Sequence, residues 1–290
     1  MCRWVGYLGG AVRPEELLYE TEHSLITQSQ ESKFYENGIN GDGFGLGWYG
    51  NRTIPGIYRN EAPAWADRNL QEICAQVETR LFLAHIRAST GTDVQQTNCH
   101  PFRYRNWLFV HNGFVADYQA VRKELLMAIS PELFPNIAGS TDSEVLFHLA
   151  LTFGLLTEPI PALERMAGFV EEVGARHGST EPLQMTLGLS DGECLYAVRY
   201  ASGAVVNTLF MSESIEALRE LYPERERLQH FRPGARSIVS EPLVKLHGAW
   251  SEVPVSTALT ISGGGRVESR PFAPRAPTSA QQALGVRLTA

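Results

Sequence analysis

Cys2 stands where removal of Met1 would make it the first residue of the mature chain. Methionine is normally removed when the second residue is small, and Cys2 would then carry both a thiol and an α-amine. An α-amine has a pKa of about 7.7–8.0, so near neutral pH much of it is an unprotonated base. One residue can therefore supply a nucleophile and its general base. A cysteine at position 2 is also compatible with an incidental residue, so the rest of the chain must decide.

A second candidate group follows the apolar segment Trp107-Leu108-Phe109-Val110-His111, which predicts a buried strand. The next two residues are Asn112 and Gly113. Thiol attack on an amide creates a tetrahedral oxyanion, and a side-chain amide beside a backbone N–H can stabilise that charge. Asn-Gly is also a strong signal for a tight hairpin turn, so a plain turn is the alternative interpretation.

Two charged residues could hold a substrate. Arg87 alternates with apolar neighbours in LFLAHIR, a predicted strand over residues 81–87. A buried arginine favours a bidentate carboxylate partner, either a structural acid or a substrate carboxylate. Asp142 lies in STDSE, residues 140–144, which is typical of a helix start. Its carboxylate either complements the helix dipole or pairs with a substrate ammonium.

The elements that must position these residues are strands towards both ends of the chain and helices in the middle. We predict helices over residues 14–25, 118–127, 142–153 and 161–177. Strands are predicted over residues 3–8, 81–87, 107–111, 183–189, 194–200, 205–211, 237–240 and 257–261. A glycine-rich loop from residue 37 feeds a further strand that ends near residue 50. This order predicts an α+β architecture with largely antiparallel sheets.

Composition excludes several function classes. The 290 residues are 43% hydrophobic and 20% charged, as in ordinary globular proteins, and the formal net charge is −7. Without a block of Lys and Arg, we expect neither nucleic acid nor an anionic membrane as a partner. No apolar run approaches the roughly 20 residues of a membrane span, and the N-terminus has no secretory pattern.

The cysteines and histidines do not form a recognisable framework. The four cysteines are scattered and form no CxxC: Cys2, Cys74, Cys99 and Cys194. We therefore expect reduced thiols and a cytoplasmic location. The possible zinc ligands match no compact finger spacing: His85, Cys99, His100 and His111. We expect neither a metal site nor a cofactor.

Together these stretches resemble the class II glutamine amidotransferases, which have the N-terminal-nucleophile (Ntn) hydrolase fold. The matching segments keep the family's order and spacing: MCRW at the start, NGDGFGLGWYG from Asn40, LAHIRAST from Leu83, TNCHPF from Thr97, FVHNG from Phe109 and GSTDSE from Gly139. The resemblance is closest to small members that begin MCR and carry a motif such as Ser240-Glu241-Pro242-Leu243. It covers residues 1–262, so we expect one amidotransferase domain there and a loosely ordered C-terminal extension over 263–290.

The resemblance implies a four-layer α/β/β/α sandwich of two antiparallel sheets, and it implies roles for particular residues. It makes Cys2 the nucleophile that forms a γ-glutamyl thioester, and Asn112 and Gly113 the oxyanion hole. Arg87 is similar to the arginine that binds the substrate α-carboxylate, and Asp142 to the acid that binds the α-ammonium. The glutamine pocket of the family is lined at the positions of Thr90 and His100.

The chain departs from the larger family members in two respects. They carry a second domain that consumes ammonia, whereas this sequence ends soon after the glutaminase-like part. Some also place a lid tryptophan after the arginine, where this chain has Ala88. The smaller residue leaves room for a bulkier γ-glutamyl substrate.

Three functions remain open from the sequence. The first is hydrolysis of the γ-glutamyl amide of glutamine or of a related compound. The second is ammonia supply to a separate synthetase subunit. The third is a non-catalytic sensor of γ-glutamyl metabolites, which retention of the thiol argues against, because a sensor would not need it.

Overall fold

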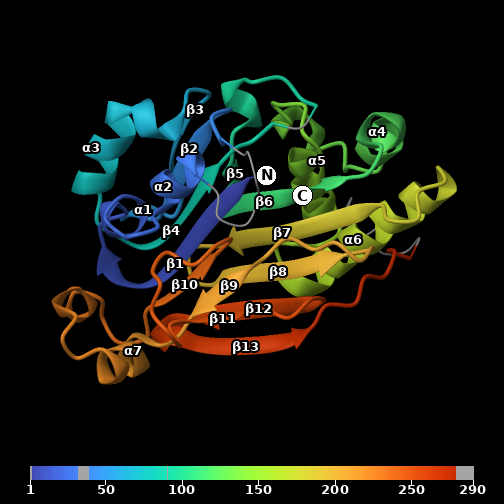
Figure 1. The fold of residues 1–290 in the computed structure, drawn as a ribbon. Coiled ribbons are helices and arrows are strands. Elements are labelled where there is room, and N and C mark those ends of the chain that lie inside the picture. The colour runs from blue at the N-terminus through green and yellow to red at the C-terminus, as the bar shows by residue number, and fades with distance from the viewer. Residues whose placement is uncertain (1, 32–38, 90, 279–290) are drawn as a thin grey trace.

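The computed structural model describes residues 2–31, 39–89 and 91–278 of the chain. Two antiparallel sheets pack face to face, and helices cover both outer faces (Figure 1). The predicted α+β fold with a four-layer sandwich is confirmed. Among the described residues, the structure contains no helix with the length and apolar character needed to cross a membrane.

The first sheet has seven strands, with β1 and β4 near its centre. In spatial order they are β11 (Trp250–Glu252), β9 (Phe210–Ser212), β10 (Arg236–Val239), β1 (Arg3–Val12), β4 (Thr79–Ile86), β2 (Phe44–Trp48) and β3 (Gly56–Asn60). Strand β1 pairs with β4 from Arg3 opposite Ile86 to Leu8 opposite Leu81. This pairing places the residues just before β1 beside those just after β4, so Cys2 and Arg87 lie at the same end of the sheet.

The second sheet has six strands. In spatial order they are β13 (Arg266–Pro271), β12 (Thr257–Ser262), β8 (Leu195–Ala201), β7 (Leu183–Ser190), β6 (Trp107–Val115) and β5 (Phe102–Tyr104). Asn112 and Gly113 pair with Thr186 and Met185 inside the β6–β7 ladder. The hairpin-turn interpretation of this dipeptide is therefore wrong, because the strand continues to Val115.

Helices cover the sheets in two groups. The second sheet is covered by α4 (Tyr118–Met127), α5 (Asp142–Thr152) and α6 (Pro159–Arg176), and the first by α1 (Glu15–Leu18), α2 (Leu25–Gln30), α3 (Arg68–Gln76) and α7 (Ile215–Leu221). Five short 3-10 helices lie in the connections: η1 (Ala64–Ala66), η2 (Gln96–Asn98), η3 (Phe134–Asn136), η4 (Glu226–Gln229) and η5 (Gly263–Gly265). A third apolar cluster, which includes Trp4 and Val110, fills the space between the sheets.

Some predicted elements differ from the observed ones. The single helix expected over residues 14–25 is two short helices, because the backbone N–H of His23 bonds to Leu243 O, and Ser24 then caps α2. The strand expected over 205–211 is reduced to β9. Residues 266–271, placed in the predicted C-terminal extension, form β13 against β12. Residues 279–290 lie outside the described part.

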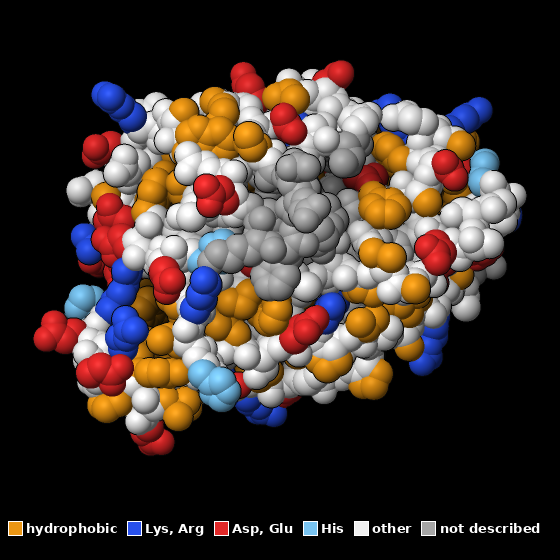
Figure 2. Space-filling view, viewed as in Figure 1, with side chains coloured by type: hydrophobic (Ala, Val, Ile, Leu, Met, Phe, Trp, Pro, Cys, Tyr) orange, Lys and Arg blue, Asp and Glu red, His pale blue; other side chains and the backbone are white. Residues whose placement is uncertain are grey.

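The surface agrees with the absence of a basic block in the sequence. On the face shown in Figure 2, Lys and Arg side chains are scattered among Asp and Glu side chains. The chain as a whole carries a formal charge of −7. A negatively charged substrate would therefore be held by local cations inside a site.

Candidate active site

The ends of β1, β4 and β6 and the start of α5 enclose a cavity of about 730 Å³. Its wall includes four of the residues singled out in the sequence: Cys2, Arg87, His100 and Asp142. These residues are far apart in the chain, and the antiparallel pairing of the strands brings them together. Thr90, a fifth predicted residue, lies outside the described residues.

The thiol of Cys2 lies against the backbone of Ala88. The Ala88 N–H donates to Cys2 Sγ at 3.4 Å, and Sγ lies 3.5 Å from Ala88 O. Burial raises the pKa of the Cys2 thiol, while the contact with Ala88 and the charge of Arg87 oppose that rise. Ala88 therefore contacts the thiol through its backbone N–H and carbonyl, not through its side chain.

The backbone carbonyl of Cys2 is also bound by Arg3, which belongs to a buried ion pair. Arg3 Nη1 donates to Cys2 O at 3.0 Å, and Arg3 Nε binds Glu241 Oε1. The other carboxylate oxygen of Glu241 lies 3.3 Å from His23 Nε2. Burial raises the pKa of Glu241, but the bonds from His23 and Arg3 outweigh it, so the pKa of this carboxyl is lowered.

Trp4 and Ser240, the residues next to this pair in the sequence, are also hydrogen-bonded to each other. The Trp4 N–H donates to Ser240 Oγ, and the Ser240 N–H donates to Trp4 O, both at 3.0 Å. Arg3 and Glu241 were not among the residues expected to act in the site. The motifs MCR and SEPL contained both residues, but nothing in the sequence shows that segments more than two hundred residues apart meet.

Arg87 is a buried cation in the cavity wall, 3% exposed. Its guanidinium donates to neutral groups: Asp42 O at 3.2 Å, Ser89 Oγ at 3.1 Å and Thr92 Oγ1 at 2.7 Å. No carboxylate among the described residues lies within 4.0 Å of it. Of the two partners considered from the sequence, a structural acid is therefore not found, and a ligand carboxylate fits the arrangement.

Asp142 is the first residue of α5, and its carboxylate is oriented by the backbone. Oδ2 accepts from the Val115 N–H at 2.9 Å, and Oδ1 accepts from the Ser143 N–H at 2.7 Å. These bonds fix α5 to the end of β6 while Asp142 remains in the cavity wall. The interpretation as an acid in the first turn of the helix is confirmed, and contact with a substrate ammonium stays a prediction.

His100 contributes an uncharged ring to the cavity wall. Burial lowers the pKa of His100 well below its usual value, and the neighbouring His85 lowers it further because the two rings cannot readily both be protonated. The two rings lie 4.1 Å apart, centroid to centroid. Neither nitrogen of His100 has a hydrogen-bond partner among the described residues. Across the described chain, no group of three or more His, Cys, Asp or Glu is arranged to hold a metal ion.

Asn112 and Gly113 are not part of this cavity wall. Within β6, the first residue that lines the cavity is Phe114. His111 points towards α5, where its Nδ1 lies 2.8 Å from Ser143 Oγ, so strand alternation turns Asn112 towards the other sheet. Its side chain is buried there, beside Thr186, its partner in the ladder, which accepts a hydrogen bond from Trp4 Nε1. At Gly113, a Cβ atom would lie 1.9 Å from Gln184 O, so no larger residue fits this backbone.

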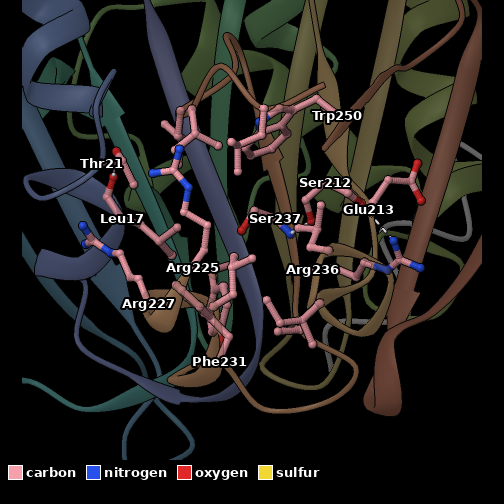
Figure 3. A pocket seen from close by; sticks show the side chains of 18 of the residues that line it. Leu17, Thr21, Ser212, Glu213, Arg225, Arg227, Phe231, Arg236, Ser237 and Trp250 are labelled. Carbon is pink, nitrogen blue, oxygen red and sulfur yellow. Dashed lines mark hydrogen bonds between the residues drawn. The ribbon is translucent and has the colours of Figure 1, made fainter. Parts of the chain in front are cut away.

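A different cavity, of about 420 Å³, lies between α1, α7 and the edge strands of the first sheet. Figure 3 shows its apolar residues, such as Leu17 and Phe231, with arginines around them. None of the residues predicted to act in chemistry lines it. The combination of thiol, cation and acid therefore favours the cavity at Cys2 as the active site.

The family of the chain follows from comparison with known proteins. The model of the class II glutamine amidotransferases matches residues 22–211. The probable glutamine amidotransferase DUG3 of Saccharomyces cerevisiae is 29% identical over 291 residues, covering 90% of this chain and 82% of that protein. The gamma-glutamyl-hercynylcysteine sulfoxide hydrolase of Mycobacterium tuberculosis is 32% identical over 117 residues, covering 40% of this chain and 50% of that protein.

Solved structures support the same family. A glutamine aminotransferase class-II domain protein from Silicibacter pomeroyi has a TM-score of 0.70 and 33% identity, covering 94% of this chain and all of that one. The glutamine phosphoribosylpyrophosphate amidotransferase of Bacillus subtilis has a TM-score of 0.61 at 15% identity, over 95% of this chain and 50% of that one, and this likeness shows the fold alone. The chain therefore belongs to the class II glutamine amidotransferases and is an enzyme of that type.

Proposed function

We propose that the mature protein hydrolyses the γ-glutamyl amide of glutamine or of a related compound, with Cys2 as the nucleophile. The observation that carries this proposal is the shared cavity of Cys2, Arg87 and Asp142. A thiol lies there with the cation of Arg87 and the acid of Asp142, opposite charges that can bind the zwitterionic head of an amino acid. Binding that head orients the side-chain amide for attack.

The proposed reaction uses the two groups of mature Cys2. The α-amine takes the proton of the thiol, and Sγ attacks the amide carbonyl to form a tetrahedral oxyanion. The C–N bond of the amide then breaks, and the leaving ammonia or amine takes the proton from the α-ammonium of Cys2. The product is a γ-glutamyl thioester, which water hydrolyses to glutamate. While Met1 is attached, the Cys2 nitrogen is part of a peptide bond and cannot act as this base.

The remaining predicted residues have supporting roles in this proposal. The Asn112 side chain and the Gly113 N–H would stabilise the oxyanion. Two observations support these roles: the side chain of Asn112 faces the first sheet, and Gly113 directly precedes Phe114, the first residue of β6 in the cavity wall. Arg87 would bind the α-carboxylate, Asp142 the α-ammonium, and Thr90 and His100 the rest of the glutamyl group.

Among these substrates we include γ-glutamyl compounds larger than glutamine. The cavity of about 730 Å³ lies in the range of pockets that enclose drug-sized ligands, about 300–1,000 Å³. Ala88 adds little bulk at its edge. The similarity to a hydrolase named for a γ-glutamyl substrate supports the same choice.

A hydrolysis screen tests the proposal. Glutamine, glutathione and other γ-glutamyl amides are incubated with the isolated protein, and released glutamate is measured. We expect turnover by the isolated chain, loss of turnover in Cys2→Ala, and full turnover in Cys74→Ala, which removes a buried thiol outside the site. Glutamine turnover that requires an added synthetase would favour ammonia supply instead, and binding without turnover would favour a sensor.

A further inference from the structure

A separate cavity of about 370 Å³ lies next to the segment that leads into α5. Its wall is formed by residues of β3, η2, β5, η3 and α5, and it shares no residue with the wall of the active-site cavity. Polar atoms make up most of its exposed lining, in contrast to the apolar cavity of Figure 3. The chemistry of this lining indicates what kind of ligand it would bind.

Two guanidinium groups in this wall form no ion pair with a carboxylate of the described residues. Arg59 Nη1 donates to Cys99 O at 3.1 Å, and Arg103 Nη1 donates to Pro55 O at 2.9 Å. Neither group lies within 4.0 Å of a carboxylate among the residues that the structure describes. Burial lowers the pKa of Arg59 and outweighs the opposing influence of Cys99 and Glu144, which reflects the cost of a partly buried charge.

The one acid in the wall is already occupied by the backbone. Glu144 Oε1 accepts from the Ala138 N–H at 3.0 Å, and Oε2 accepts from the Gly139 N–H at 2.7 Å. Its oxygens therefore face the chain segment before α5. Two arginines against one glutamate give the wall a formal charge of +1. This balance favours an anionic ligand.

His148 adds a hydrogen-bond acceptor to the same wall. Its Nδ1 lies 2.8 Å from Glu144 O, and because a carbonyl oxygen can only accept, Nδ1 must carry the hydrogen. Burial lowers the pKa of His148, so the ring is neutral and Nε2 is a bare acceptor. The residue is 3% exposed, and Nε2 has no partner among the described residues. A buried acceptor of this kind is costly unless a donor meets it.

We propose that this cavity binds a small phosphate-type anion that retains a hydroxyl hydrogen. Its charged oxygens would accept from Arg59 and Arg103, and its hydroxyl would donate to His148 Nε2. Hydrogen phosphate meets both requirements, and so does a phosphate ester that carries a hydroxyl on its organic part. Sulfate has the charge and the shape, but at neutral pH it has no hydrogen to donate.

The comparison of phosphate with sulfate is therefore the direct test. Binding of each ion to the full chain is measured by titration calorimetry at pH 7, in a buffer that contains neither. We expect phosphate to bind at least about tenfold more tightly, because sulfate leaves the buried acceptor unmet. Equal affinity for the two ions would overturn the proposal. Glycerol 3-phosphate in the same assay identifies the source: tighter binding than phosphate indicates an organic phosphate, and weaker binding indicates free phosphate.

Two arginines on one hairpin provide a matched pair of variants. Arg103 lines the cavity and Arg105 does not, and both side chains are exposed, so neither substitution disturbs the core. Arg103→Gln should weaken phosphate binding about tenfold or more, while Arg105→Gln should leave it unchanged. Equal loss in both variants would show an adventitious ion only. In His148→Phe, if it folds, the preference for phosphate over sulfate should disappear.

Discussion

Glu241→Gln should strongly destabilise the fold and disturb the support of Cys2. The carboxylate binds buried Arg3 on one side and His23 on the other, and Arg3 in turn binds the carbonyl of Cys2. Glutamine keeps the size of the side chain and removes its charge. The buried guanidinium of Arg3 then loses the negative charge of the carboxylate that it binds through Nε.

The size of the effect follows from burial. The side chains of Arg3 and Glu241 are 2% and 0% exposed, and removing one partner of such a pair costs about 3–5 kcal/mol. Glu124→Gln is the matched control, because Glu124 pairs with Arg176 where both side chains are about two-fifths exposed. Exposed pairs contribute roughly 0–1 kcal/mol.

Chemical denaturation at pH 7 gives the free energy of unfolding for the two variants and the parent. The pKa of Glu241 is lowered in the fold, so its contribution is present above its unfolded pKa and is lost as pH falls through the folded value. The difference between Glu241→Gln and the parent should therefore shrink in acid. A cost below about 1 kcal/mol at pH 7, equal to that of Glu124→Gln, would refute the role given to this pair.

Three further predictions follow from single contacts. Arg87→Lys should raise KM for glutamine about tenfold or more with a smaller change in kcat, because a lysine cannot form the bidentate pair with a carboxylate. Steady-state kinetics measures both constants, and an unchanged KM would contradict the proposed carboxylate contact. Gly113→Ala should destabilise by roughly 3 kcal/mol, because its Cβ would meet Gln184 O at 1.9 Å, and thermal unfolding of the variant shows whether it does. Burial lowers the pKa of His85 in the folded state to about 3. Below about pH 6.5 the unfolded state binds a proton at His85 that the folded state does not bind, so as the pH falls this residue should lower the free energy of unfolding by about 1.4 kcal/mol per pH unit. Denaturation at pH 6.5 and pH 5 measures that slope, which should be smaller in His85→Gln; equal slopes would show that His85 does not contribute.

The sequence predicted well those elements whose signals are local. Helix α4 spans Tyr118–Met127 as predicted, and α5 begins at Asp142, where Thr141 caps it by accepting from the Glu144 N–H. Caps and apolar periodicity are properties of a few neighbouring residues, so the sequence alone shows them. Strands β3 and β5 were not predicted, because they are short segments of mixed polarity at the sheet edges, where each pairs with a single neighbouring strand.

Long-range contacts explain what the sequence could not show. Asn112-Gly113 has the composition of a turn, yet Gly113 is needed where the backbone of β7 approaches closely. Arg87 was correctly expected to be buried, but only the structure shows that its bonds go to neutral groups. The link from Arg3 to Glu241 joins residues 238 positions apart, and no local pattern predicts such a pair.

The central claim is that mature Cys2 forms a γ-glutamyl thioester. Mature protein is mixed with glutamine or with the best substrate of the screen, quenched in acid, digested and analysed by mass spectrometry. The account predicts a γ-glutamyl adduct on an N-terminal Cys2 without Met1, and neither adduct nor turnover in Cys2→Ala. Turnover in a preparation that retains Met1, or an adduct on another residue, would contradict it.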